Sequence, residues 1–290
     1  DWVYAWRMLR KQPTYAIAAM IALGLAIGAN TSMFSAADAL LFRPLELERL
    51  DRLVHAYGGA EGARFGDIEF AAADYRDLRE QARSFEDVAA YAFRGVNLTG
   101  DGIPQRAQAM AVTRNFFPLL GVEVLHGRGF RPDSEEGAVA ILAYDFWQRR
   151  YAGDVSVVGR RVELNGAPYE IVGIAPARMK FPAMAEMWLP VNETPAWRAD
   201  RSNFQWTLLG RLRDEVSEAQ AQREVVEFGR RLAREHPATH QQRSASVVAL
   251  RESISGAFVG DYTRLSMWAA GFLLLIACAN VANLHFARVS

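Results

Sequence analysis

Two uncharged apolar runs lie near the two ends of the chain, and the pattern between them is mixed. The first run is Pro13–Ala37 and the second is Leu265–Leu284. At a rise of about 1.5 Å per residue, each is long enough to cross a hydrocarbon core about 30 Å thick. We therefore expect transmembrane helices over 13–42 and 264–286. A signal peptide is the alternative for the first run, and a buried core helix is the alternative for the second.

The charges beside these runs predict how the chain is oriented. Basic residues precede the first run, and His285 and Arg288 follow the second. Positive charge close to a membrane span favours the cytoplasmic side, whereas a long intervening segment has little influence. Both outer ends are therefore expected in the cytoplasm, with the protein in the inner (plasma) membrane and its middle domain periplasmic. The predicted order is a cytoplasmic amphipathic segment (1–12), the first helix (13–42), an extracytoplasmic domain (43–263), the second helix (264–286) and a cytoplasmic end (287–290).

The segment before the first run is amphipathic. At helical spacing, Trp2 and Trp6 lie on one side of it, and Arg7, Arg10 and Lys11 lie on the other. Tryptophan at headgroup depth with nearby cations is typical of a helix lying on a membrane surface, and also of an aromatic belt beside a span. We expect these five side chains to contact the cytoplasmic membrane surface or a cytoplasmic partner.

Between the runs, the pattern changes to alternating strands and helices. The clearest hairpin joins two alternating segments, Val162–Leu164 and Tyr169–Ile174, through Asn165-Gly166. Asn-Gly favours a tight turn because both central residues need positive φ. Further strands are expected at Arg52–Tyr57, Arg106–Thr113, Gln205–Asp214 and Ser244–Leu250.

The clearest helix of the middle segment begins at Ser217, with Gln220 three residues later as in a capping box, and it ends at Pro237. One stripe of it is apolar, comprising Ala221, Val225, Phe228 and Leu232. A strand, a long helix and a second strand pack as helix on sheet. The fold class predicted is α+β, a mixed sheet-and-helix domain in two lobes, inserted between two transmembrane α-helices.

The segment Asp67–Tyr91 is interpreted as two short helices, the second beginning at Ser84 with Asp87 as its capping partner. Its acidic side chains alternate with arginines at helical spacing, which is typical of a solvated helix face rather than a metal site. The acidic residues are Asp67, Glu69, Asp74, Asp77 and Glu80.

Composition and charge exclude several classes of function. Lys and Arg number 33 and Asp and Glu number 33, so no net positive field favours nucleic acid, and no nucleic-acid partner is expected. The one cysteine, Cys278, excludes an intrachain disulfide and a thiolate metal cluster. The sequence begins at Asp1 rather than at Met, so we expect it to be a piece of a longer protein.

The sequence lacks the common catalytic motifs. No Gly-Lys pair occurs, so a phosphate-binding loop is absent, and neither a Gly-x-Ser-x-Gly nor a His-Glu-x-x-His pattern is found. His236 and His240 have a metal-ligand spacing, but Pro237 between them would interrupt the helix that the geometry needs. His55 and His126 are isolated and are interpreted as structural or surface residues. We expect no enzymatic activity, no cofactor and no metal.

Small and amide-bearing residues stand inside the apolar runs. Gly24 and Gly28 form Gly-x-x-x-Gly, with Asn30 shortly after, and Asn280 and Asn283 lie one helical turn apart in the second run. Small residues let helix backbones approach closely, and an amide in hydrocarbon costs free energy unless it is paired. We therefore expect these five residues to pack against other transmembrane helices rather than lipid.

Several long stretches resemble one family of transport proteins. The ends, RMLRKQPTYAIAAMIALGLAIGANTSMFSAADALLFRPL and LLLIACANVANLHFARVS, resemble the FtsX-like ABC transporter permeases. The segments NFFPLLGVEVLHGRGF and YDFWQRRYAGDVSVVGRRVELNGAPYEIVGIAP resemble the MacB-like periplasmic core domain of the same group. The resemblance covers essentially the whole chain and is strongest to the duplicated orphan permeases of Acidobacteria.

This resemblance implies the permease subunit of an ABC transport system, with an exported domain between its first two spans. Such permeases work with a separate ABC-type ATPase, which binds the ATP. The movement it drives is relayed along the spans to the periplasmic domain, an action called mechanotransmission, and the implied process is efflux or export. Other implied partners are further permease helices or a second permease module, and the lipid bilayer. The resemblance supplies no catalytic residue.

Two other classes of function remain open from the residues alone. One is a two-span membrane receptor with an extracytoplasmic sensing domain, and the other is an anchored exported enzyme. The enzyme would need a nucleophile, a base or a metal group that the sequence does not display. The permease is therefore the preferred interpretation.

Overall fold

The computed structural model of the protein describes residues 47–60, 69–131 and 138–256, together with helical residues at 20, 24, 27, 28, 31, 267–269, 271, 272 and 275. Two compact units are distinguished: residues 1–44 with 254–290, and residues 45–253, which we call the core unit. In the part of the chain that the structure describes, no helix combines the length and apolar character needed to cross a membrane. Most of the residues predicted to span the membrane, in 13–42 and 264–286, lie outside the described residues.

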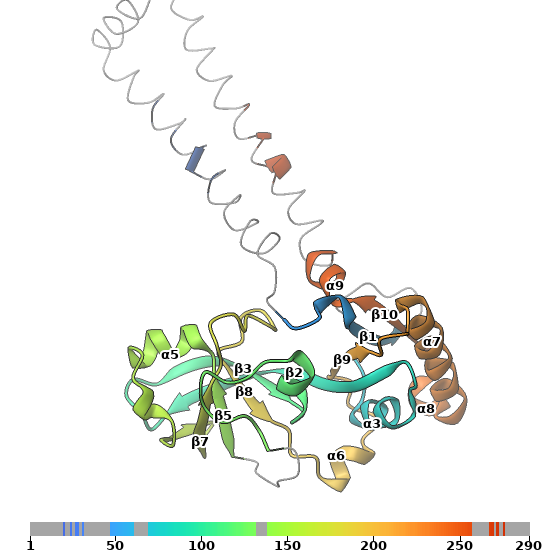
Figure 1. Ribbon diagram of the computed structural model, residues 1–290, viewed down its shortest axis with the longest axis horizontal. Helices are drawn as coiled ribbons and strands as arrows, with labels where there is room; N and C mark the ends of the chain where they lie inside the picture. The colour runs from blue at the N-terminus through green and yellow to red at the C-terminus, as the bar shows by residue number, and fades with distance from the viewer. Residues whose placement is uncertain are drawn as a thin grey trace, which may run out of the picture. The chain divides into compact units, whose positions relative to one another are not determined.

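Strands and helices follow one another within the described ranges between residues 47 and 256 (Figure 1). The strands are β1 Leu53–Ala60, β2 Phe85–Thr99, β3 Gln105–Val112, β4 His126–Gly127, β5 Val139–Leu142, β6 Arg161–Leu164, β7 Ala167–Ile174, β8 Met187–Pro190, β9 Thr207–Leu212 and β10 Arg243–Ala249. The helices are η1 Leu50–Arg52, α3 Ala72–Gln81, α4 Phe116–Leu120, α5 Tyr144–Tyr151, η2 Val155–Val157, α6 Pro195–Ala199, α7 Glu218–Glu235, α8 Pro237–His240 and α9 Leu250–Gly256. Every strand predicted from the sequence is present.

The ten strands belong to one sheet, in the order β10-β1-β9-β2-β3-β8-β5-β7-β4. Because β6 pairs with both β2 and β7, the strands β2, β3, β8, β5, β7 and β6 form a closed ring of neighbours. Beyond β2, the strands β9, β1 and β10 form an open part. The α+β class is confirmed. The two lobes stay a prediction, since residues 45–253 form one compact unit and the long strand β2 runs through both the ring and the open part.

Two helices cover one face of the open part. Figure 1 shows α3 and α7 beside β1, β9 and β10. The strands β9 and β10 both run antiparallel to β1, which lies between them, and α7 is the connection from one to the other. The predicted apolar stripe of α7 is buried in the core, together with Val54 and Ala56 of β1. The predicted capping box is also confirmed, since Ser217 N–H donates to Gln220 Oε1 at 2.7 Å.

The predicted hairpin is confirmed in register and in turn. Val162 faces Tyr169, and Leu164 faces Ala167. The turn residues Asn165 and Gly166 have φ of 52° and 81°, the left-handed conformation that Asn-Gly was expected to supply. The alternation of exposed and buried positions does not persist along β7, whose last four residues, 171–174, are all buried.

The second helix predicted within 67–91 is wrong: the chain forms β2 from Phe85 onward. A bulge shifts the register between Phe85 and Asp87, so Phe85 and Val88 fall on the same face and enter the same core. Apolar residues three positions apart on one face are also typical of an α-helix, so this spacing led to the wrong prediction. Pairing with β9 and β3 on the two edges outweighs the helical preference of the alanines.

Helix α7 approaches β10 at a glycine, which leads to a first prediction. A Cβ at Gly229 would stand 2.8 Å from Ala245 Cβ and 3.0 Å from Ala245 N. Because the neighbour is backbone, it cannot rotate away. We expect Gly229→Ala to lower the free energy of unfolding by about 1–3 kcal/mol, although alanine is the better helix former. Urea unfolding should show this loss, and the exposed neighbour Arg230→Ala should change stability by less than about 0.5 kcal/mol. An unchanged Gly229→Ala would contradict the close approach.

Candidate functional site where the chain enters and leaves the core unit

The chain enters and leaves the core unit through neighbouring strands. Strand β1 follows η1 directly, and α9 follows β10 directly. The two strands pair antiparallel, with Val54 opposite Ala249. The first residues of β1 and the last residues of β10 therefore lie together at one end of the sheet.

A group of side chains held by hydrogen bonds and ring contacts joins these two connections, and we call it the His55 cluster: His55, Tyr57, Tyr91, Phe181 and Ser253. His55 Nδ1 lies 2.5 Å from Ser253 Oγ of α9 and 2.7 Å from the Tyr57 hydroxyl. His55 Nε2 lies 3.0 Å from the Tyr91 hydroxyl of β2. The Phe181 ring lies 5.8 Å from the His55 ring and 5.6 Å from the Tyr91 ring. The cluster thus ties β1, β2 and α9 together.

The His55 cluster is uncharged. Burial lowers the pKa of His55 to about 3, and burial raises the pKa of Tyr57 and Tyr91 above the ordinary tyrosine value. A neutral imidazole has one N–H and one acceptor nitrogen, so it can both donate to and accept from these hydroxyls. Such a weakly basic histidine is a poor general base for Ser253, and the arrangement is structural.

His55 was expected to be isolated, and that part of the prediction is wrong. In β1 the side chain of His55 points to the other face of the sheet from those of its neighbours Val54 and Ala56. That is the face that α3 and α7 do not cover. The strand pattern could have revealed its burial, because Leu53 and Tyr57, which share its face of β1, are apolar and buried as well. Its partners at positions 91 and 253 could not be inferred from spacing. His126 packs against Trp147, with ring centroids 5.6 Å apart.

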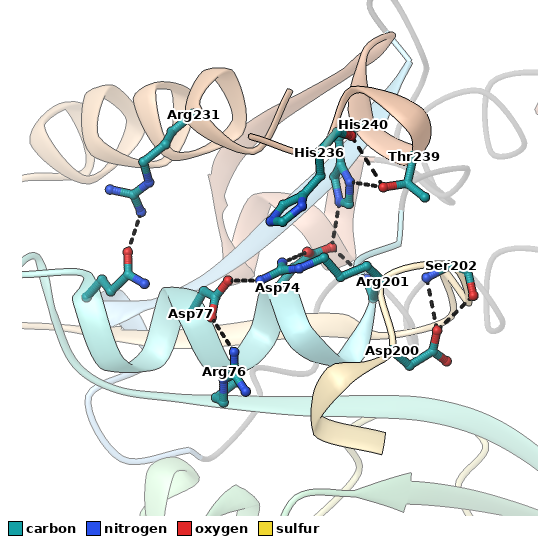
Figure 2. A network of polar contacts seen from close by, with 12 residues as sticks. Asp74, Arg76, Asp77, Asp200, Arg201, Ser202, Arg231, His236, Thr239 and His240 are labelled. Atoms are coloured by element: carbon teal, nitrogen blue, oxygen red, sulfur yellow. Dashed lines mark hydrogen bonds and ion pairs between the residues drawn. The ribbon is translucent and has the colours of Figure 1, made fainter. Parts of the chain in front are cut away.

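A second polar network is centred on Asp74 of α3, which is 0% exposed (Figure 2). Asp74 Oδ2 lies 3.0 Å from His240 Nε2 and accepts the N–H of Ala71 at 3.0 Å. Asp74 Oδ1 accepts from Arg201 Nη1 at 2.9 Å. His240 Nδ1 in turn lies 2.7 Å from Thr239 Oγ1. The network connects α3, α8 and the segment before β9.

Asp77, one turn further along α3, extends this network. It pairs with Arg201 and accepts from Arg76 Nη2 at 3.0 Å. Burial alone would raise the pKa of Asp77, but the hydrogen bonds from Arg201 and Arg76 hold it below the ordinary value. Arg231 of α7 donates to Gln81 of α3 at 2.6 Å on the same side (Figure 2).

Asp74 and Asp77 are therefore not on the solvated face that was predicted, whereas Glu80 of α3 is exposed and Asp67 lies outside the described residues. Asp74 stands four residues before Leu78 and three after Ala71, within the buried stripe of the helix. That spacing is the signal that sequence reasoning missed. Its charge is accommodated by Arg201, which is far away in the sequence.

The histidine pair with metal-ligand spacing is divided by the helix end, as the proline predicted. Helix α7 ends at Glu235, and α8 begins at Pro237. His240 faces Asp74, while the His236 ring lies 6.1 Å from the His240 ring. Among the described residues, no group of three or more His, Cys, Asp or Glu side chains could hold a metal ion.

The residues predicted to pack in the membrane are only partly described. Gly24 and Gly28 are helical, and no described atom lies within 4 Å of a Cβ placed on either. The remaining predicted site residues lie outside the described residues: Trp2, Trp6, Arg7, Arg10, Lys11, Asn30, Asn280 and Asn283. Their roles stay predictions.

Comparison with known proteins identifies the domain. The family model described as MacB-like periplasmic core domain matches residues 16–228. No protein of the curated collection matches the chain.

Solved structures share the fold at low sequence identity. A domain assigned to a permease protein from Porphyromonas gingivalis has 17% identity and a TM-score of 0.54, and covers 71% of this chain and 92% of its own. The periplasmic region of MacB from Actinobacillus actinomycetemcomitans has 15% identity and a TM-score of 0.54, with 70% and 91% covered. The extracellular domain of the noncanonic ABC-type transporter YknZ from Gram-positive bacteria has 15% identity and a TM-score of 0.51, with 67% and 98% covered. Because the family model spans well over half of the sequence, this chain belongs to the MacB-like periplasmic core domain family.

Proposed function

We propose that this chain is the permease subunit of a MacB/FtsX-like ABC transport system in the inner (plasma) membrane. In this proposal its core unit is periplasmic. A separate ATPase binds and hydrolyses ATP, and the resulting movement of the spans displaces the core unit in efflux or export. The proposal rests on the match to the family core domain and on the pairing of β1 with β10. Because the chain enters the core unit just before β1 and leaves it just after β10, both connections to the flanking segments start from this one pair of strands.

Hydrogen bonds hold the incoming connection. Arg211 of β9 donates through Nη1 to the Glu48 carbonyl at 3.2 Å and through Nε to the Leu119 carbonyl at 3.0 Å. Arg52 of η1 donates to the Val216 carbonyl at 3.0 Å. Bonds of this kind resist separation of the chain from the sheet, so a pull on the incoming segment would act on β9 as well as β1.

The outgoing connection is held by the His55 cluster. Ser253 of α9 meets His55 and Tyr57, and His55 reaches Tyr91 on β2. Since β2 continues into the ring of strands, a displacement of α9 would reach both parts of the sheet. This arrangement supports mechanotransmission because movement needs a stiff connection rather than a loose linker.

Exposed apolar side chains support a membrane location for the flanking helices. Large apolar residues exposed on described helical positions are Met20, Ile27, Met267, Trp268, Phe272 and Leu275. Such residues are stable in a bilayer or against other helices and unfavourable in water. The proposal assigns them to the predicted spans and to contacts with lipid or with further permease helices.

Co-purification and cross-linking test the proposed function. We expect the full-length protein, solubilised in detergent, to co-purify with an ABC-type ATPase. Cysteines at Leu40 and Met267, in a chain carrying Cys278→Ala, would be joined by a flexible bifunctional reagent. The cross-linking yield in the assembled complex should differ between the nucleotide-free and ATP-bound states, because ATP moves the spans.

A matched pair controls for general changes in reactivity. Glu163 and Pro168 face each other in the β6–β7 hairpin, and cysteines there should give the same yield in both states. An unchanged yield for the Leu40 and Met267 pair would contradict mechanotransmission. Absence of any ATPase would instead favour a two-span receptor with a sensing domain.

A further inference from the structure

The short helix α4 lies where the two connections of the core unit meet. Its last turn contacts the segment through which the chain enters, and its first residue contacts the His55 cluster, which holds the segment through which the chain leaves. Phe116 and Leu120, at its two ends, are fully buried. In a close-packed interior, a helix of five residues moves with the groups that pack on it.

Arg211 of β9 fastens the incoming segment to the last turn of α4. Its side chain is buried, and it donates from Nη1 to the Glu48 carbonyl at 3.2 Å and from Nε to the Leu119 carbonyl at 3.0 Å. Its Nη2 donates to the Leu119 carbonyl as well. A buried guanidinium needs acceptors for its N–H groups, so one side chain holds two segments that are far apart in the sequence.

The side chain of Glu48 also packs directly on the turn that follows α4. Gly121 has φ of 65°, and a Cβ placed on it would stand 2.5 Å from Glu48 Cβ. Because Glu48 Cβ is bonded to the backbone, it cannot rotate away. Both the left-handed conformation and this close approach therefore require glycine here. We call Arg211, Glu48, Leu119 and Gly121 the Arg211 clamp.

The outgoing segment reaches α4 through aromatic rings. The Phe116 ring lies 5.8 Å from the Tyr91 ring and 6.2 Å from the Phe181 ring, between centroids, and is stacked on the latter. Both rings belong to the His55 cluster, in which His55 meets Ser253 of α9. Close-packed side chains transmit displacement, so a shift of α9 acts on Phe116.

Helix α4 is embedded in the core of the ring part. The Phe117 ring lies 5.3 Å from the ring of Trp188 on β8 and 5.9 Å from the Phe130 ring. Asn115, just before the helix, donates from Nδ2 to the carbonyl of Val88 on β2 at 2.8 Å. A displacement of α4 is therefore carried into β2 and β8, two strands of the ring.

We propose that α4 receives the movement of both flanking segments and passes it to the ring part, and that Arg211 is the positioning residue that couples α4 to the incoming segment. This inference rests on the proposed function and adds a route to it. Strands β1 and β10, which begin and end the core unit, both belong to the open part of the sheet, so α4 gives the ring a connection that does not run through these strands.

Hydrogen–deuterium exchange of the full chain in detergent, without nucleotide, tests the clamp. In Arg211→Met we expect exchange to be at least about fivefold faster over residues 47–53 and 116–122, because methionine donates to neither carbonyl. Arg211→Lys should be intermediate, since an ammonium lacks the planar fork that reaches several acceptors. Arg213→Met is the matched control: the exposed Arg213 side chain donates to the Arg83 carbonyl instead, so its loss should leave both segments unchanged. Unchanged exchange over α7 would show that global stability is not the cause.

A second variant tests the clamp without altering Arg211, which matters if Arg211→Met does not fold. Gly121→Ala should displace Glu48 and speed exchange over residues 47–53 by at least about fivefold. Gly166→Ala is its matched control. Gly166 also has a left-handed φ, of 81°, but no described atom lies within 4 Å of a Cβ placed there, so exchange over residues 47–53 should stay the same.

Comparing nucleotide states in the assembled complex tests the route through α4. In the unmodified protein, exchange over residues 116–122 should differ between the nucleotide-free and ATP-bound states. In Arg211→Met this difference should be at least about twofold smaller, while the cross-linking yield of the Leu40 and Met267 pair still responds to ATP. A side chain that only stabilised the fold would not separate these two responses.

Three results would overturn the inference. They are unchanged exchange over residues 47–53 in both Arg211→Met and Gly121→Ala, an ATP response over residues 116–122 that is as large in Arg211→Met as in the unmodified protein, and no such response in an unmodified protein whose spans move. Failure of the proposed function is distinguishable, because the Leu40 and Met267 yield would then not depend on ATP in any variant. The exchange measured without nucleotide would still decide whether the clamp exists.

Discussion

Replacing Asp74 with alanine is expected to lower the free energy of unfolding by about 3–5 kcal/mol, the largest effect of any substitution considered for stability. The carboxylate is fully buried and satisfies Arg201, His240 and the Ala71 N–H at once. Its removal leaves the Arg201 guanidinium, whose side chain is 20% exposed, with Asp77 as its one remaining described counter-charge, and it leaves His240 Nε2 and the Ala71 N–H without their carboxylate partner. Removing one partner of a buried ion pair costs much more than the pair contributes.

Urea unfolding followed by tryptophan fluorescence would measure this loss. Asp145→Ala is a matched control, because Asp145 pairs with Lys180 while its side chain is 57% exposed, and its loss should cost less than about 1 kcal/mol. The loss of unfolding free energy in Asp74→Asn should lie between those of Asp74→Ala and Asp145→Ala, since the amide keeps the shape of the side chain and part of its hydrogen bonding. If Asp74→Ala cost no more than Asp145→Ala, the Asp74 network would not stabilise the fold.

Local sequence signals predicted the elements whose stabilising contacts are also local. Helix α7 was found from its capping residue Ser217 and its apolar stripe, and the β6–β7 hairpin from Asn165-Gly166. Strand β2 was missed because the bulge near Phe85 brings residues three apart onto one face. A helix and a bulged strand produce the same spacing there, and only pairing with distant strands decides between them.

The candidate site was less predictable than the fold. The apolar neighbours Leu53 and Tyr57 on its face of β1 could have predicted that His55 is buried, and the stripe of α3 could have placed Asp74 inside the core. Neither pattern reveals that His55 meets Ser253, 198 residues away, or that Asp74 meets Arg201, 127 residues away. Buried polar groups take their partners from whichever segments the topology brings near, so their presence was predictable and their partners were not.

The His55 cluster makes stability depend on pH in a defined direction. The pKa of His55 is about 3 in the folded protein, against 6.5 for an unperturbed histidine. Between these values the unfolded chain binds a proton that the folded protein does not, so stability rises with pH in this window. The contribution is complete above pH 6.5 and is lost as pH falls towards 3. This contribution to the free energy of unfolding changes by about 1.4 kcal/mol per pH unit, which gives a loss of about 3 kcal/mol at pH 4.5.

Comparing variants isolates this effect from the carboxylates that also titrate in acid. We expect the free energy of unfolding to fall less steeply with falling pH in His55→Gln than in the unmodified protein, because the titrating group is gone. Between pH 6.5 and 4.5 the two slopes should differ by about 1.4 kcal/mol per pH unit. His126→Gln, outside the cluster, should keep the slope of the unmodified protein. Equal slopes in all three proteins would mean that His55 accepts a proton without unfolding. Because hydroxyl oxygens accept as well as donate, the two imidazolium N–H groups would then donate to the Tyr91 hydroxyl at Nε2 and to Ser253 or Tyr57 at Nδ1, and the hydroxyls would reorient rather than α9 separate from β1.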